Sequence, residues 1–354
     1  MNFNKLFLVT LLGVFMASCS NDDNGLETPS GAYADGVIVL NQGGFLAGNS
    51  SVSFISDAFE LENNIYSAVN GGALLGDTGQ DIGFNDDLAY IVMNASNKIE
   101  VVDRYTFDHV ATISAGLENP RYIAFDDNKA FVTNWGDASI ATDDYVAVID
   151  LDANTIVTTI PVAEGPERIV ENNGKLYVSH YGGYGFGNSV SVINTNANTV
   201  SNTISVGDRP NFMEVKDNKL YVLSEGLPNY ASAETTGKLQ VINLSNNTVV
   251  STLNFAGIQH PTNMVLEDGK IYYTIGADVF TMQKDAATLP AEPAFSTTAQ
   301  EVSGIYAFNV SEDHIYVADA VDYSQEGKVY VYSATGALQH NYTVGVIPCG
   351  FYFN

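Results

Sequence analysis

The stretch Lys175-Leu-Tyr-Val-Ser-His is the unit from which the fold of this chain follows. Related phrases, each with an aromatic residue in third place among apolar residues, recur about every 44 residues. Their aromatic centres are Tyr90, Phe131, Tyr177, Tyr221, Tyr272 and Tyr316. A second alternating strand follows most of them, as in Ser189-Val-Ser-Val-Ile-Asn, and presents one apolar face to a neighbouring layer. Four short strands in a repeat of this length predict the blades of a β-propeller.

The two ends of the chain together complete one blade. Pro348-Cys-Gly-Phe-Tyr-Phe matches the first strand of a repeat, whereas Gly36-Val-Ile-Val-Leu-Asn and Ser51-Val-Ser-Phe-Ile-Ser match a second and a third strand. Pairing these segments closes the ring and removes its open sheet edges. The sequence therefore predicts an all-β, seven-bladed β-propeller over residues 35–354, closed by pairing of the C-terminal strand with the N-terminal blade. A β-sandwich, or six blades with an irregular extra one, is the alternative.

Composition limits the classes of function. The 354 residues include 41 Asp and Glu against 14 Lys and Arg, a net charge of −27. A surface this acidic repels nucleic acids and anionic membrane surfaces, so neither is an expected partner. The chain is 45% hydrophobic and only 16% charged, which is enough for a folded core.

The N-terminal residues have the pattern of an export signal. One lysine, an apolar run from Leu6 to Met16 and the small residues Ala17 and Ser18 precede Cys19. The ending resembles a bacterial lipobox, so residues 1–18 are expected to be a lipoprotein signal peptide and Cys19 the site of lipidation. Residues 19–34 are then a flexible acidic tether. The expected location is the outer membrane, at the cell surface, with membrane contact only through the lipid anchor.

The loops between the second and third strands of the blades are uneven in length and rich in aromatic residues. They share one face with the loops that enter the innermost strands, where polar residues and three arginines lie near the axis. Exposed aromatic rings on a rigid scaffold favour capture of a bulky ligand. The candidate ligand-binding residues are Phe45, Arg121, Trp135, Arg168, Tyr181, Tyr184, Phe186, Arg209, Asn211, Tyr230 and Tyr323. The alternative for the arginines is structural pairing with carboxylates such as Glu167 and Asp208.

Catalytic motifs are not found in the sequence. The histidines occur singly, and there is no Walker loop, haem motif or Gly-X-Ser-X-Gly. A propeller hydrolase would need polar ligands on its innermost strands, and the matching positions are apolar. We therefore expect no catalytic residues, no metal and no cofactor. The open alternative is a hard cation such as Ca²⁺ held among dispersed loop acids, namely Asp137, Asp143, Asp144, Asp319 and Asp322.

Several phrases resemble one known family. Gly36-Val-Ile-Val-Leu-Asn-Gln-Gly-Gly-Phe, Gly79-Gln-Asp-Ile, Asn97-Lys-Ile-Glu-Val-Val-Asp and Asn119-Pro-Arg-Tyr-Ile are similar to surface lipoprotein propellers of the YncE-like class. That class includes a lipoprotein that captures vitamin B12 above a TonB-dependent transporter. The resemblance implies a non-catalytic, cell-surface protein that takes up a corrinoid and delivers it to an outer-membrane TonB-dependent transporter. A scaffold for a peptide, a glycan or an envelope protein is the alternative function.

Overall fold

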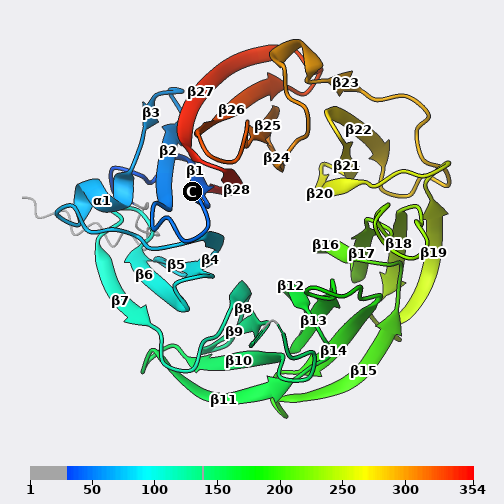
Figure 1. The fold of residues 1–354 in the computed structure, drawn as a ribbon, viewed down its shortest axis with the longest axis horizontal. Coiled ribbons are helices and arrows are strands. Elements are labelled where there is room, and N and C mark those ends of the chain that lie inside the picture. Colours follow the sequence, from blue (N-terminus) through cyan, green and yellow to red (C-terminus); the bar gives the residue numbers. More distant parts are fainter. Residues whose placement is uncertain (1–29, 138) are drawn as a thin grey trace, which may run out of the picture.

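The computed structural model describes residues 30–137 and 139–354. Over these residues the chain forms seven four-stranded antiparallel sheets arranged as a ring around a central axis (Figure 1). The predicted seven-bladed β-propeller is confirmed. The expected signal peptide and Cys19 lie outside the described residues.

Each blade runs from an innermost strand near the axis to an outermost strand at the rim. The first sheet comprises β28 (Pro348–Phe353), β1 (Gly36–Asn41), β2 (Ser51–Ser56) and β3 (Leu61–Glu62), and the second comprises β4 (Gly79–Asn85), β5 (Leu88–Met93), β6 (Lys98–Asp103) and β7 (His109–Ile113). The third comprises β8 (Pro120–Asp126), β9 (Lys129–Asn134), β10 (Tyr145–Asp150) and β11 (Thr155–Pro161), and the fourth β12 (Pro166–Glu171), β13 (Lys175–His180), β14 (Ser189–Asn194) and β15 (Thr199–Ser205). The fifth comprises β16 (Pro210–Lys216), β17 (Lys219–Ser224), β18 (Lys238–Asn243) and β19 (Thr248–Asn254), and the sixth β20 (Thr262–Glu267), β21 (Lys270–Ile275), β22 (Asp278–Gln283) and β23 (Phe295–Ser296). The seventh comprises β24 (Ala307–Ser311), β25 (His314–Asp319), β26 (Glu326–Ser333) and β27 (Leu338–Val346).

Two short helices complete the described residues: α1 (Ile65–Val69) and a 3-10 helix, η1 (Thr298–Gln300). Neither is long enough to cross a lipid bilayer.

The C-terminal strand closes the ring as expected. β28 pairs antiparallel with β1, with Phe351 opposite Val39 and Tyr352 opposite Ile38. The side-chain amide of Asn354 then donates to the backbone oxygen of Tyr33 at 2.7 Å. Tyr33 is itself buried in the core, so the packed domain includes residues that the sequence analysis placed in the tether.

The core lies between the blades. The central aromatic residue of each repeat phrase is buried, and apolar clusters join strands of adjacent sheets. Phe131 from β9, for example, packs in one cluster with Ile169 and Val178 of the next blade. The outermost strands are largely exposed, as β15 shows. Because every sheet covers its neighbour, a propeller buries both faces of its inner strands and holds the innermost residues rigidly around the axis.

Candidate functional site

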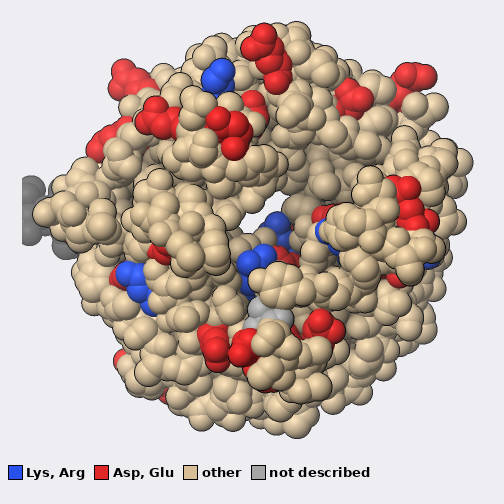
Figure 2. Space-filling model, in the orientation of Figure 1, with Lys and Arg blue, Asp and Glu red and all other residues tan. Residues whose placement is uncertain are grey.

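A cavity of about 540 Å³ lies on the axis of the ring. Figure 2 shows the central opening, with basic side chains at its edge on a surface where acidic ones are scattered. Its walls come from the innermost strands of the blades and from the loops of one face. The lining residues are Gln42, Phe45, Thr78, Gln80, Asn94, Arg121, Tyr122, Trp135, Glu167, Arg168, Tyr181, Asn211, Phe212, Glu225, Thr262, Asn263, Ile305, Tyr306 and Cys349.

β-Bulges at the start of the innermost strands direct side chains into this cavity. In β4, β8, β12, β16 and β20 the pairing register shifts within the first residues. Hydroxyl groups of the second strands accept from the bulged backbone: Tyr122 N donates to Thr133 Oγ1 at 3.0 Å, and Arg168 N donates to Ser179 Oγ at 3.1 Å. Because a bulge re-aims the residues next to it, consecutive residues such as Arg121 and Tyr122 both line the cavity.

Two of the three predicted arginines are paired with carboxylates. Arg121 binds Glu167 through two nitrogens, with Nη2–Oε1 at 2.7 Å and Nε–Oε2 at 3.0 Å, and its guanidinium lies 4.2 Å from the centre of the Trp135 ring. Arg209 binds Glu225 at 3.1 Å. Both pairs agree with the structural pairing named as the alternative, although the partner of Arg209 is Glu225 of the same blade and not Asp208.

Arg168 is held in a different way. Its guanidinium lies between two aromatic rings, 4.1 Å from the centre of Tyr122 and 4.6 Å from that of Phe212. Its Nε is buried and has no hydrogen-bond partner among the described residues. No described carboxylate forms an ion pair with it. Arg168 is thus a stacked cation whose charge is not neutralised by direct contact.

A second cavity of about 240 Å³ continues along the axis beneath the first. The residues that line both cavities are Gln80, Tyr122, Arg168, Phe212, Asn263 and Cys349. Arg168 therefore lies where the two halves of an axial channel meet.

Two carboxyl groups line the lower cavity. Burial raises the pKa of Glu214 to about 7, against a hydrogen bond from Leu266 N at 2.6 Å. Burial also raises the pKa of Asp81, which accepts hydrogen bonds from Tyr352 Oη and Ile123 N, both at 3.1 Å, and lies in the field of Arg168. Both acids are therefore more easily neutralised than a surface carboxylate.

The entrance of the upper cavity carries exposed aromatic rings. Among the described residues, every Phe, Tyr or Trp classed as exposed lies on the same face, in loops between second and third strands or before an innermost strand. We call this set the aromatic face: Phe45, Tyr184, Phe186, Tyr230, Tyr306 and Tyr323. Tyr184 and Tyr230 are 81% and 75% exposed. The rings also approach one another across blades, as in Phe186 and Tyr230 with centres 6.3 Å apart.

The predicted residues separate into two groups. Phe45, Arg121, Trp135, Arg168, Tyr181 and Asn211 line the cavity. The second group lies on the aromatic face but does not line the cavity: Tyr184, Phe186, Tyr230 and Tyr323. Arg209 does not line the cavity either, but it stacks on Tyr181 with its guanidinium 4.4 Å from the ring centre.

Sequence reasoning missed several wall residues. Tyr122, Phe212 and Asn263 each come directly after a residue that lines the cavity. In a regular strand consecutive side chains point to opposite faces, so the sequence predicts that these three point away from it. A signal was present in the second strands: Thr133, Ser179 and Thr274 occupy the same place in the repeat phrase, and each hydroxyl bonds to the neighbouring innermost strand.

The apolar positions of the innermost strands are all buried: Ile123, Ile169, Met213, Met264 and Phe351. Three of them, Met213, Met264 and Phe351, also line the lower cavity. Within residues 30–137 and 139–354, no group of three or more His, Cys, Asp or Glu side chains is placed to hold a metal ion. Burial raises the pKa of the Cys349 thiol to about 12, so this group is a poor nucleophile in the channel.

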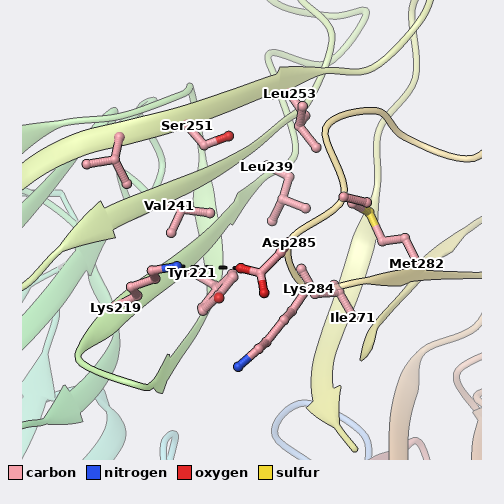
Figure 3. A pocket seen from close by; sticks show the side chains of 12 residues that line it. Lys219, Tyr221, Leu239, Val241, Ser251, Leu253, Ile271, Met282, Lys284 and Asp285 are labelled. Carbon is pink, nitrogen blue, oxygen red and sulfur yellow. Dashed lines mark hydrogen bonds and ion pairs between the residues drawn. The ribbon is translucent and has the colours of Figure 1, made fainter. Parts of the chain in front are cut away.

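A third cavity, of about 220 Å³, lies at the rim between the fifth and sixth blades (Figure 3). Aliphatic side chains such as Leu239, Val241 and Leu253 form part of its wall. Lys219 Nζ lies 3.5 Å from Asp285 Oδ1 at its edge. Its polar lining comes from charged and hydroxyl groups such as Lys284 and Ser251, without the amide side chains that line the axial cavity.

The fold and the axial cavity define the class of this protein as a seven-bladed β-propeller with a polar central site. The chain belongs to the family described as domain of unknown function (DUF5074), whose model matches residues 35–345. No curated protein matches the sequence.

Solved structures of similar shape support the fold. A quinoprotein alcohol dehydrogenase-like protein from Bacteroides thetaiotaomicron VPI-5482 is 16% identical, with a TM-score of 0.66 over 91% of this chain and 78% of that chain. A functionally unknown protein from Desulfotomaculum acetoxidans DSM 771 is 15% identical, with a TM-score of 0.64 over 90% of this chain and 98% of that one. Hydrazine synthase of Kuenenia stuttgartiensis is 15% identical, with a TM-score of 0.60 over 76% and 88%. At these identities the similarity concerns the fold alone.

Proposed function

We propose that this protein is a non-catalytic binding propeller that captures a bulky small molecule at the mouth of the axial cavity. The observation that carries the proposal is the aromatic face above a cavity of about 540 Å³. Exposed aromatic rings offer large contact areas at a low cost in side-chain entropy. The cavity volume is within the usual range of roughly 300–1,000 Å³ for small-molecule sites.

The polar walls indicate what such a ligand offers. Gln80, Asn94 and Asn211 bring amide groups to the cavity, and such groups can both donate and accept hydrogen bonds. The pairing of Arg121 with Glu167 holds one wall rigid without adding net charge. A ligand with a flat or apolar part for the aromatic face and amide or hydroxyl groups for the cavity walls suits this arrangement.

The specific ligand that we propose is a corrinoid, since the sequence resembles surface lipoproteins that capture one. A corrinoid carries a broad ring for the aromatic face and amide arms for the polar walls. In this proposal the protein is anchored through Cys19 at the outer surface of the outer membrane and passes its ligand to a TonB-dependent transporter.

Titration calorimetry of the purified protein with cyanocobalamin tests the proposal. We expect saturable heat at micromolar protein, and a loss of affinity of at least tenfold in a Tyr184→Ala/Tyr230→Ala variant. Val157→Ala, which trims an exposed side chain on an outermost strand, is the matched control and should bind as the wild type does. Heat no larger than the dilution blank would remove the corrinoid assignment.

A further inference from the structure

The three arginines near the axis differ in one respect that bears on the ligand. Arg121 and Arg209 each contact a carboxylate, and both pairs are mostly buried. Arg168, on the same set of innermost strands, contacts two aromatic rings and no described carboxylate. A buried cation is costly unless something pairs with it.

The stacking leaves the hydrogen-bonding edge of Arg168 available. Arg168 Cζ lies 4.1 Å from the centre of the Tyr122 ring and 4.6 Å from that of the Phe212 ring, and these ring contacts give the N–H donors of the guanidinium no oxygen acceptor. Its buried Nε–H has no acceptor among the described residues. A planar fork of donors that is fixed in position and lacks acceptors matches a carboxylate or phosphate group, which can accept two parallel hydrogen bonds.

The position of Arg168 lets a ligand reach it. The side chain lines both the upper cavity, which opens at the aromatic face, and the lower one. The amide of Gln80 lines the same junction: one of its two N–H groups donates to Tyr122 Oη at 3.0 Å, and the second can donate to a ligand. Both N–H groups of Asn263, by contrast, already donate to Thr274 Oγ1 and Ile305 O. The acids whose charges act on Arg168 are already engaged: Asp81 accepts from Tyr352 and Ile123, and Glu167 pairs with Arg121.

We propose that Arg168, clamped between Tyr122 and Phe212, forms an anion subsite in the axial channel that receives a carboxylate or phosphate group of the captured ligand. The inference rests on the proposed function, because it names the chemical group that the same cavity takes. The aromatic face holds the bulk of the ligand, and the anionic group extends inward to Arg168. An anion at this place supplies the acceptors that the guanidinium lacks.

The test uses small probes that isolate the charged group. Binding of phenyl phosphate, benzoate and the uncharged benzyl alcohol is measured by titration for the wild type, Arg168→Gln, Arg168→Lys and Lys284→Gln. We expect the wild type to prefer at least one of the two anions over benzyl alcohol by tenfold or more, and the comparison of phenyl phosphate with benzoate shows which anion fits. Arg168→Gln should lose that preference, and Arg168→Lys should keep part of it, because lysine retains the charge without the fork.

Lys284→Gln is the matched control, since it also removes one positive charge. Lys284 lines neither axial cavity and follows β22, the third strand from the axis in its blade. Retention of the anion preference in Arg168→Gln, its equal loss in Lys284→Gln, or no preference for either anion in the wild type would overturn the subsite. Thermal unfolding of each variant confirms that it is folded. Failure of the cyanocobalamin titration together with Arg168-dependent anion binding would reject the corrinoid and leave the subsite standing, so the two proposals fail separately.

Discussion

The axial cavity and the rim cavity between the fifth and sixth blades both carry basic side chains, but they hold them differently. At the axis, the side chains of Arg121 and Glu167 are 16% and 6% exposed and form a two-point ion pair. At the rim, Lys219 and Asp285 are 40% and 68% exposed and meet through a single contact of 3.5 Å (Figure 3).

The difference shows where charge has energetic weight in this protein. Water screens the rim pairs, and holding two long side chains together has an entropic cost that nearly cancels their attraction. The axial charges have lost most of their water, so each depends strongly on its partner. We therefore expect a charged ligand to bind more strongly at the axis than at the rim, although both places contain cations.

Breaking the axial pair should have the largest effect on stability. Arg121→Met leaves the Glu167 carboxylate buried without its cation, and we expect the free energy of unfolding to fall by about 3 kcal/mol or more. Urea denaturation followed by circular dichroism measures the change. The double variant Arg121→Met/Glu167→Met should recover most of the loss, because it removes the unpaired charge as well. An unchanged unfolding midpoint in the single variant would show that the axis is no more sensitive than the rim.

The buried acid of the lower cavity should give a smaller, pH-dependent effect. Because the pKa of Glu214 is about 7 in the folded protein and 4.5 in a model peptide, the folded state binds the proton more tightly. Glu214 therefore lowers stability as the pH rises from about 5 to 7, by up to about 3 kcal/mol, and the full cost remains at higher pH.

Glu214→Gln removes this cost and keeps an oxygen that can accept from Leu266 N. The variant should be more stable than the wild type at pH 8 and equal to it near pH 5. Urea unfolding at a series of pH values measures both curves. Parallel curves for the two proteins would contradict the raised pKa.

Breaking a rim pair should have the smallest effect. Lys284→Gln removes the contact with Asp217, a pair whose side chains are 25% and 58% exposed. We expect the urea midpoint to stay within experimental error of the wild-type value, since exposed pairs contribute little. A loss as large as that of Arg121→Met would remove the contrast between axis and rim.

The repeat phrase explains why the ring could be predicted. Strands such as Lys175–His180 lie between two sheets and are buried on both faces. The apolar pattern that this burial requires can be read within each strand alone. The closing strand was predictable for the same reason. The segment of Phe351 matches the first strand of a blade, the segment of Val39 matches the second, and the two pair in the structure.

The walls of the site were predictable only in part. Arg121, Arg168 and Arg209 were identified as candidates, but their spacing does not tell which of them lacks a carboxylate. Glu225, which pairs with Arg209, lies beside it at the end of the β16–β17 hairpin, where Glu225 N donates to Arg209 O at 3.1 Å. Asp208, the sequence neighbour expected as the partner, instead accepts a hydrogen bond from Thr235.

The sequence by itself determined the number of blades, the closure of the ring and the face that carries aromatic loops, because each follows from periodicities within one repeat. The tertiary structure alone decided which axial arginine has no carboxylate partner within residues 30–137 and 139–354. Bulges turn consecutive residues such as Glu167 and Arg168 to the same cavity. Around the axis, Glu167 then pairs with Arg121 of the neighbouring blade and not with an arginine of its own blade. Such choices depend on distances between sheets, which no single strand encodes.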